Sequence, residues 1–152
     1  MPLDRPDLDE VTQSDIDELI ANSVSEGYRL EFKRQPYGNS DGDRREFLKD
    51  VTALANATGG HLIVGIDAKD GVARSLVPLQ DGAIDAEFQR LESLLRDGVE
   101  PRVSGIRMRA VQVDGGAVLI VRVPRSWNQP HRVSHGRSNR FYVRNSSGVH
   151  EA

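Results

Sequence analysis

Apolar and polar positions follow a regular period over most of the chain, and the period changes near glycines and prolines. Residues 1–13 are polar and marked by prolines, which predicts a flexible N-terminal lead-in. Behind Ser14, residues 15–20 carry acids followed by apolar residues at helical spacing, which predicts a short helix ending near Ser25. Residues 28–33 alternate with a period of two and predict a half-buried strand with Tyr28 on its apolar face.

The middle of the chain predicts two helices on either side of a buried strand. After a turn-rich loop at residues 36–42, an apolar stripe runs from about residue 43 to 57, and Gly59 is suited to closing that helix. Residues 61–66 are nearly all apolar, which is typical of a strand covered on both faces. A further apolar stripe from about residue 84 to 96 predicts the next helix.

The last third of the chain predicts β-structure. Residues 106–109 alternate, residues 114–116 are a hairpin signal, and residues 117–123 form an apolar run ended by a proline. A loop at residues 125–139 then leads to a last strand at 140–144. The order of elements is therefore α-β-α-β-α-β-β-β.

This order predicts a single α/β (α+β) domain over residues 14–152, with helices packed on a mixed β-sheet. The 152 residues suit one hydrophobic core. The chain has no cysteine, which excludes disulfides and thiolate metal sites, so a metal ion would be held by carboxylates or histidines. No apolar stretch has the length of a signal peptide core or a membrane span, so we expect a soluble cytoplasmic protein without a membrane partner.

The net charge of −3 conceals a strong asymmetry. Residues 1–100 hold 11 Lys and Arg against 21 Asp and Glu, a balance of −10, whereas residues 101–152 hold nine Arg against Asp114 and Glu151, a balance of +7. Such a basic segment predicts a polyanionic partner, and arginine is suited to phosphate and to stacking on bases. The alternative is a surface that only keeps the protein soluble.

The same segment supplies the predicted nucleic-acid contacts. Trp127 is a stacking side chain near cations, as unpaired nucleic acid favours, although it could also cover an edge of the core. The predicted contact residues are Arg107, Arg109, Trp127, His131, Arg132, Arg137, Arg140 and Arg144.

Acidic residues near the first strand suggest metal chemistry. Glu31 and Lys33 are two residues apart in a strand and leave the same face, which sets a carboxylate beside an ammonium group. Asp67 is a second acid, and Glu26 is either a third metal ligand or a residue that orients one of the ligands. Together with Glu31, these acids would suit Mg²⁺ or Mn²⁺. The alternative is a solvated charged face with an ion pair.

The glycines at 59 and 60 do not form a phosphate loop. They follow a helix and precede a strand, which is the reverse of the order in which such a loop presents its backbone amides, and the chain holds no Gly-x4-Gly-Lys-Ser/Thr motif. We therefore interpret them as a helix cap and a close backbone approach.

Several motifs together resemble the Schlafen AlbA_2 family. They are Glu26-x4-Glu31-Phe32-Lys33, the run from Phe47 to Asp67 with its Asn56-Ala57-Thr58-Gly59-Gly60, the strand 118–124, Gln129-Pro130-His131, and the run from Phe141 to Ser147. The likeness covers nearly the whole chain from about residue 14.

This resemblance implies a metal-dependent endoribonuclease that acts on tRNA or other structured RNA. Glu26, Glu31 and Asp67 would hold the Mg²⁺ or Mn²⁺ ion, and Lys33 would neutralise the scissile phosphate. Schlafen proteins pair two such lobes in one chain, so a single lobe implies a homodimer. The alternatives are a non-catalytic module that binds DNA or RNA through its arginines and, less favoured, a nucleotide-sensing domain.

Overall fold

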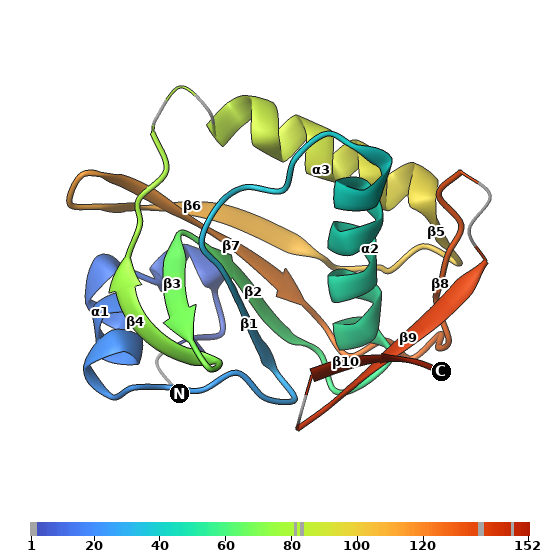
Figure 1. Cartoon of the computed structure of the whole chain (residues 1–152), viewed down its shortest axis with the longest axis horizontal. Coiled ribbons are helices and arrows are strands. Elements are labelled where there is room, and N and C mark those ends of the chain that lie inside the picture. Colours follow the sequence, from blue (N-terminus) through green and yellow to red (C-terminus); the bar gives the residue numbers. More distant parts are fainter. Residues whose placement is uncertain (1–2, 81, 83, 137–138, 147) are drawn as a thin grey trace.

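A four-stranded mixed sheet forms the centre of the computed structural model, which describes residues 3–152 except 81, 83, 137, 138 and 147 (Figure 1). Its strands, in spatial order, are β1 (Leu30–Lys33), β2 (Gly60–Val64), β7 (Gly116–Val123) and β6 (Arg107–Val113). β1 and β2 are parallel, and the other two pairs are antiparallel. The predicted mixed sheet with packed helices is thereby confirmed.

Both faces of this sheet are covered, which explains why every residue of β2 is buried. On one face, Leu62 joins the apolar cluster of α2 (Asp41–Ala55) and α3 (Ile84–Gly98). On the other face, Ile63 joins the cluster formed with α1 (Gln13–Ala21) and with apolar residues that precede α1. No described helix is both long and apolar enough to cross a membrane.

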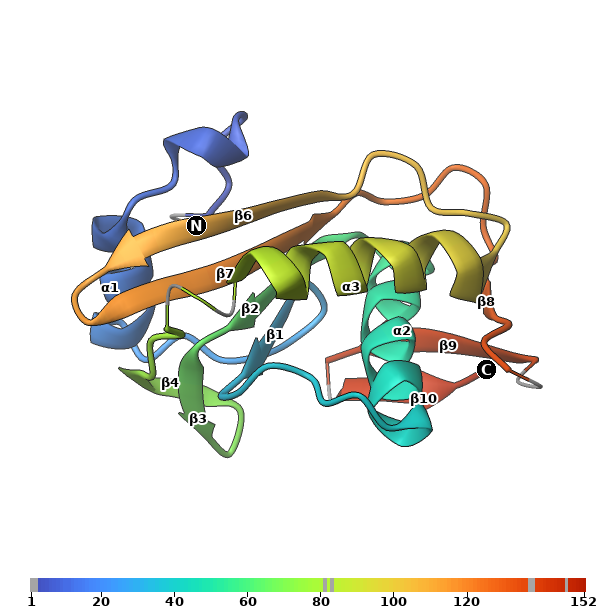
Figure 2. The ribbon, with the colours of Figure 1, turned by 90° about the horizontal axis from the view of Figure 1, so that it is seen from above.

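A second, antiparallel sheet lies beside α2. In spatial order it consists of β10 (Gly148–Glu151), β9 (Arg140–Asn145), β8 (Arg132–Val133) and β5 (Val99–Glu100). α2 contacts β2 and β7 of the central sheet as well as β8, β9 and β10 (Figure 2). The helix is therefore shared by both sheets.

Gly65 interrupts the strand that the sequence predicts at residues 61–66. Its φ of 114° is a conformation that favours glycine, and the chain turns there from β2 into β3 (Ile66–Lys69). β3 pairs with β4 (Val72–Leu76) in a separate hairpin. Asp67 therefore lies in this hairpin rather than at the end of a central strand.

The segment before α1 packs on the domain, although its polar sequence predicts a flexible lead-in. Leu3, Leu8 and Val11 are buried, and a 3₁₀ turn forms at Leu8–Glu10. Arg109 Nη1 donates hydrogen bonds to the carbonyl oxygens of Leu8 (2.8 Å) and Val11 (2.5 Å). The three apolar residues have no regular spacing, so periodicity could not reveal that they share the core.

The first strand is shorter than its alternating sequence predicts. The Gly27 N–H donates to the Leu30 carbonyl oxygen (3.4 Å), which makes a turn just before β1. Tyr28 lies in this turn and is 52% exposed, so its predicted place on the apolar face is wrong.

The end of α2 is fastened to the second sheet by one side chain. Asn56 Nδ2 donates to the carbonyl oxygens of His131 and Tyr142, both at 2.9 Å. Asn56 Oδ1 accepts a hydrogen bond from the His131 N–H at 2.7 Å. Gly59 then closes the helix with a φ of 75° and a hydrogen bond from its N–H to the Leu54 carbonyl oxygen, which confirms the predicted helix cap.

We expect Asn56→Ala to lower the free energy of unfolding by about 3 kcal/mol, because it leaves three backbone groups without their side-chain partner. Urea unfolding measures this loss. Thr58→Ala, at an exposed neighbouring position, is the control and should change stability by less than about 0.5 kcal/mol. A loss below about 1 kcal/mol for Asn56→Ala would show that solvent replaces the side chain.

Candidate functional site

A cluster of charged side chains forms around Lys33, on the face of β1 that is turned toward α2. Lys33 Nζ lies 3.2 Å from Asp50 Oδ2 and 3.7 Å from both Glu31 Oε1 and Glu46 Oε1. β1 supplies Glu31 and Lys33 two residues apart, and α2 supplies Glu46 and Asp50 one helical turn apart. We call these four residues the Lys33 cluster.

Asp50 is the most buried acid of this cluster, and it was not among the site residues predicted from the sequence. Its side chain is only 2% exposed and accepts a hydrogen bond from Tyr37 Oη at 2.6 Å. Burial raises the pKa of Asp50 to about 6, although the charge of Lys33 and the Tyr37 hydrogen bond both oppose this rise. The sequence signal that could have identified Asp50 is its position between Leu48 and Val51, inside the apolar stripe of α2.

Burial and the surrounding acids together determine the pKa values of Lys33 and Tyr37. Burial alone would lower the pKa of Lys33, but the charges of Asp50, Glu31 and Glu46 outweigh it and raise that pKa. Lys33 is therefore a cation at neutral pH. Burial also raises the pKa of the Tyr37 hydroxyl well above its usual value, with Asp50 adding to the effect, so Tyr37 stays protonated and can donate to Asp50.

Arg144, predicted as a nucleic-acid contact, is instead a buried part of the domain. Its side chain is 1% exposed and donates hydrogen bonds to the carbonyl oxygens of Leu30 (2.6 Å) and Gly27. Arg144 Nη1 lies 2.8 Å from Glu31 Oε2, but it lacks a well-aligned hydrogen bond, so this contact is an ion pair. Glu31 is therefore held between two cations, Lys33 and Arg144.

Glu26 and Asp67 do not join Glu31 in a metal-binding group. Glu26 Oε1 accepts a hydrogen bond from the Phe32 N–H (2.9 Å) at the outer edge of β1, and Asp67 pairs with Ser75 in the β3–β4 hairpin. Within the described ranges, which include all three acids, no group of three or more His, Asp or Glu side chains could hold a metal ion. The donor set as arranged does not fit the predicted Mg²⁺ or Mn²⁺ site.

Other predicted contact residues are also engaged within the protein. His131 is buried, and its ring contacts Ser126 Oγ and the Pro101 carbonyl oxygen, each at 2.5 Å. Arg109 is held by the N-terminal segment. Arg132 pairs with Glu100, and its Nη1 donates to Asn139 Oδ1 at 2.6 Å.

The remaining predicted contacts differ in their exposure. Arg107 is exposed on β6, and Trp127 is 87% exposed in the loop after β7. Arg140 is exposed and pairs with Glu151 at 2.5 Å. Arg137 lies outside the described residues.

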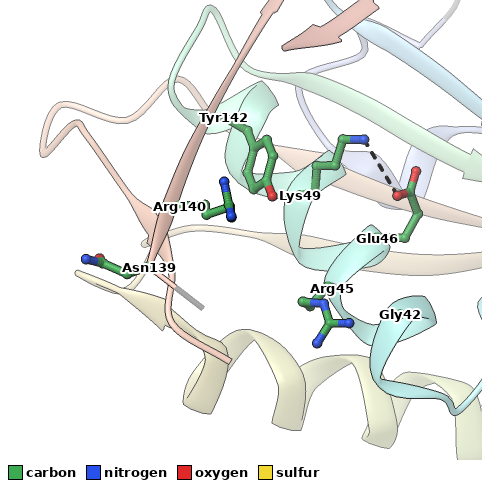
Figure 3. A pocket seen from close by; sticks show the side chains of 7 residues that line it. All are labelled: Gly42, Arg45, Glu46, Lys49, Asn139, Arg140 and Tyr142. Atoms are coloured by element: carbon green, nitrogen blue, oxygen red, sulfur yellow. Dashed lines mark ion pairs between the residues drawn. The ribbon is translucent and has the colours of Figure 1, made fainter. Parts of the chain in front are cut away.

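Arg140 belongs to an open pocket of about 860 Å³ between α2 and β9, which we call the α2–β9 pocket (Figure 3). Lys49 lies over the Tyr142 ring, with Nζ 5.9 Å from the ring centroid, and 3.7 Å from Glu46 Oε2. Three cations in the lining, Arg45, Lys49 and Arg140, thus face one acid, Glu46. The lining residues are Gly42, Arg45, Glu46 and Lys49 from α2, and Asn139, Arg140 and Tyr142 from β9 and the residue before it.

The α2–β9 pocket adjoins the Lys33 cluster, because Glu46 belongs to both. Its two α2 cations, Arg45 and Lys49, were not selected from the sequence. The signal that could have found them is their spacing of four residues, which sets both on one side of the helix.

Comparisons with known proteins give one family. The family model described as Schlafen, AlbA_2 matches residues 26–152. No curated protein sequence matches significantly.

Two of the solved structures that match this chain illustrate the shared fold. One is the N-terminal domain of a protein from Nitrosomonas europaea that is named as related to the ATP-dependent DNA helicase RecG. It is 26% identical with a TM-score of 0.61, and the match covers 86% of this chain and 84% of that chain. The other, a protein from Corynebacterium diphtheriae, is 19% identical with a TM-score of 0.57. That match covers 95% of this chain but only 27% of the other, so this chain spans about a quarter of its length.

The raised pKa of Asp50 leads to a prediction about stability. As the pH falls from about 7 to about 5, the folded protein takes up a proton at Asp50 before the unfolded chain does, so this group should add about 1 kcal/mol to the free energy of unfolding. Asp50→Asn removes the titration and should lack this gain. Urea unfolding of both proteins at the two pH values measures it.

His61 provides an internal check on this comparison. Burial and the neighbouring Arg122 lower the pKa of His61 to about 4, so His61 should reduce stability as the pH falls. Because His61 is present in both proteins, its effect cancels in the difference between them. Equal pH dependence of the wild type and Asp50→Asn would contradict the assignment of Asp50.

Proposed function

Because this chain belongs to the Schlafen AlbA_2 family, we propose that it is a nucleic-acid-binding domain that holds the phosphate backbone in its α2–β9 pocket. The observation that carries this proposal is the lining of that pocket, in which three cations and an aromatic ring face a single acid. Cationic side chains that neutralise phosphates supply most of the affinity in such complexes. The likeness to a domain of a RecG-related protein supports the same partner.

Each part of the pocket has a role in this proposal. Arg45 and Lys49 project from one side of α2 and contact phosphates, while Tyr142 offers a ring for an unpaired base. Arg140 exchanges its partner Glu151 for a phosphate. This exchange costs little, because the Arg140 and Glu151 side chains are 58% and 51% exposed and such surface ion pairs contribute at most about 1 kcal/mol.

Structured RNA such as tRNA is the substrate class that the family resemblance favours. The geometry supports binding better than cleavage, because Glu31 is neutralised by two cations and Glu26 is engaged by the backbone. Metal-dependent cleavage therefore stays a prediction of the resemblance, and it requires these acids to rearrange. Pairing of two copies into a homodimer is a further such prediction, which sedimentation with and without RNA can test.

We expect the double variant Arg45→Gln/Lys49→Gln to bind tRNA at least about tenfold more weakly than the wild type, because two phosphate contacts are lost. The slope of log affinity against log salt should fall by about 2. Filter binding over a range of salt concentrations measures both quantities, with duplex and single-stranded DNA as competitors. The matched control is Arg74→Gln, an exposed arginine of β4 that does not line the α2–β9 pocket. Equal loss in both proteins would refute the α2–β9 pocket.

Incubating the protein with tRNA and Mn²⁺, or with a chelator, tests cleavage. The proposed function predicts binding without cleavage in either condition. Asp67→Asn is the preferred variant, because Glu31→Gln would also unpair the buried Arg144. Cleavage that needs Mn²⁺ and is lost in Asp67→Asn would overturn the binding-only proposal and restore the three-acid site.

A further inference from the structure

A second basic pocket, of about 340 Å³, lies where β2 begins and β7 ends. Four arginines and one acid line it. We call it the Arg122 pocket. Its charged and polar lining residues are Asp4, Arg5, Arg29, Thr58, His61, Arg122 and Arg125.

Arg122 is held in place by neutral groups. Its Nε donates to His61 Nε2 at 3.0 Å, and its Nη atoms donate to the carbonyl oxygens of Leu3 (2.7 Å) and Pro6 (3.2 Å). Because the pKa of His61 is lowered to about 4, its ring is neutral at pH 7 and its Nε2 can accept this hydrogen bond. These contacts fix the guanidinium group without neutralising it.

The balance of charge in the pocket stays positive. Arg5 is neutralised by Asp15, to which it donates two hydrogen bonds of 2.9 and 3.0 Å. Arg29, Arg122 and Arg125 then face one lining acid, Asp4. Three guanidinium groups around one recess suit the two or three oxygens of a phosphate group.

An exposed aromatic ring adjoins this recess. The Arg125 guanidinium group, which lines the pocket, lies 4.9 Å from the centroid of the Trp127 ring. Trp127 is 87% exposed, so it does not cover an edge of the core. Large exposed aromatic side chains beside cations are typical of surfaces on which nucleic-acid bases stack.

The loop that carries Trp127 is firmly anchored. Ser126 Oγ contacts the ring of the buried His131 and accepts a hydrogen bond from the Asn128 N–H at 3.1 Å. Gln129 Nε2 donates to the Ser126 carbonyl oxygen at 2.9 Å. His131, itself held by Asn56, thus anchors the loop next to Trp127, and a loop that is already anchored loses little conformational entropy on binding.

We propose that the Arg122 pocket binds a phosphate group of an unpaired nucleic-acid strand while Trp127 stacks on a base of the same strand. The proposal rests on the proposed function in that the ligand is a nucleic acid, but it uses none of the residues of the α2–β9 pocket. Arg125 joins the two contacts, because it reaches both the phosphate recess and the tryptophan ring.

The fluorescence of Trp127 reports directly on this site, because it is the chain's single tryptophan. Titration of the wild type with single-stranded hexauridylate should quench this fluorescence. Arg29→Gln should weaken the binding about tenfold, because it removes one phosphate contact without touching Trp127. Arg74→Gln is again the matched control, with unchanged affinity expected. Arg122 itself is not varied, because its loss would also release the N-terminal segment.

The stacking contact is tested with a fluorescently labelled hexauridylate and its anisotropy. Trp127→Ala should weaken binding about tenfold, whereas Trp127→Phe, which keeps a ring, should stay within about threefold of the wild type. Trp127 is outside the core, so both variants should fold, and unchanged thermal unfolding checks this. Equal affinity of the wild type, Arg29→Gln and Trp127→Ala for the hexamer would overturn the proposal.

The outcomes separate this site from the α2–β9 pocket. If Arg45→Gln/Lys49→Gln weakens tRNA binding but hexauridylate leaves the Trp127 fluorescence unchanged, the proposed function holds and the Arg122 pocket is refuted. A second outcome is that the hexamer quenches the fluorescence and Arg29→Gln weakens this binding, while the double variant binds tRNA like the wild type. In that case the α2–β9 pocket is refuted and the Arg122 pocket holds. Absence of binding to any nucleic acid overturns both.

Discussion

Helix α2 packs against two sheets at once, and this constraint determines most of the molecule. Its apolar side chains fill the space above β2 and β7, so its buried polar side chains can find partners at only a few positions. Asp50 is satisfied by Lys33 and Tyr37 on the side of the central sheet. Asn56 is satisfied by backbone groups of the second sheet. The same helix therefore positions the Lys33 cluster, one wall of the α2–β9 pocket and the anchor of the Trp127 loop.

The periodic elements could be predicted from the sequence, because their residues are selected by burial on one face. The stripe at residues 43–57 corresponds to α2, and the apolar run at 117–123 corresponds to β7. The break at Gly65 could not be predicted, since Ile66 continues the apolar run and only the backbone angle reveals the turn. The end of the expected strand therefore belongs to the β3–β4 hairpin. Asp67 lies in this hairpin and not at the end of a central strand, where the sequence predicted it.

The residue types of the candidate site could be predicted from the sequence, but the contacts that these residues make could not. The alternation in β1 correctly grouped Glu31 with Lys33, because neighbours in one strand obey a local rule. The roles of the arginines depend on contacts across the fold. Arg109 and Arg144 each bind backbone carbonyl groups about one hundred residues away in sequence. Some of the arginines of the last third are therefore engaged inside the domain. The basic pockets instead combine cations from both halves of the chain.

Glu26 and Arg144 have a further consequence for how the domain meets its neighbours. β1 is an outermost strand whose Phe32 N–H and Leu30 carbonyl point away from β2, and these two side chains occupy both groups. Unpaired backbone groups on an outer strand are the usual starting point for intermolecular strand addition and aggregation. With these positions filled, another molecule cannot pair with the backbone there without displacing a buried arginine. Association along this side of the protein must then proceed through side chains, which leaves the β1 edge of the sheet closed to extension.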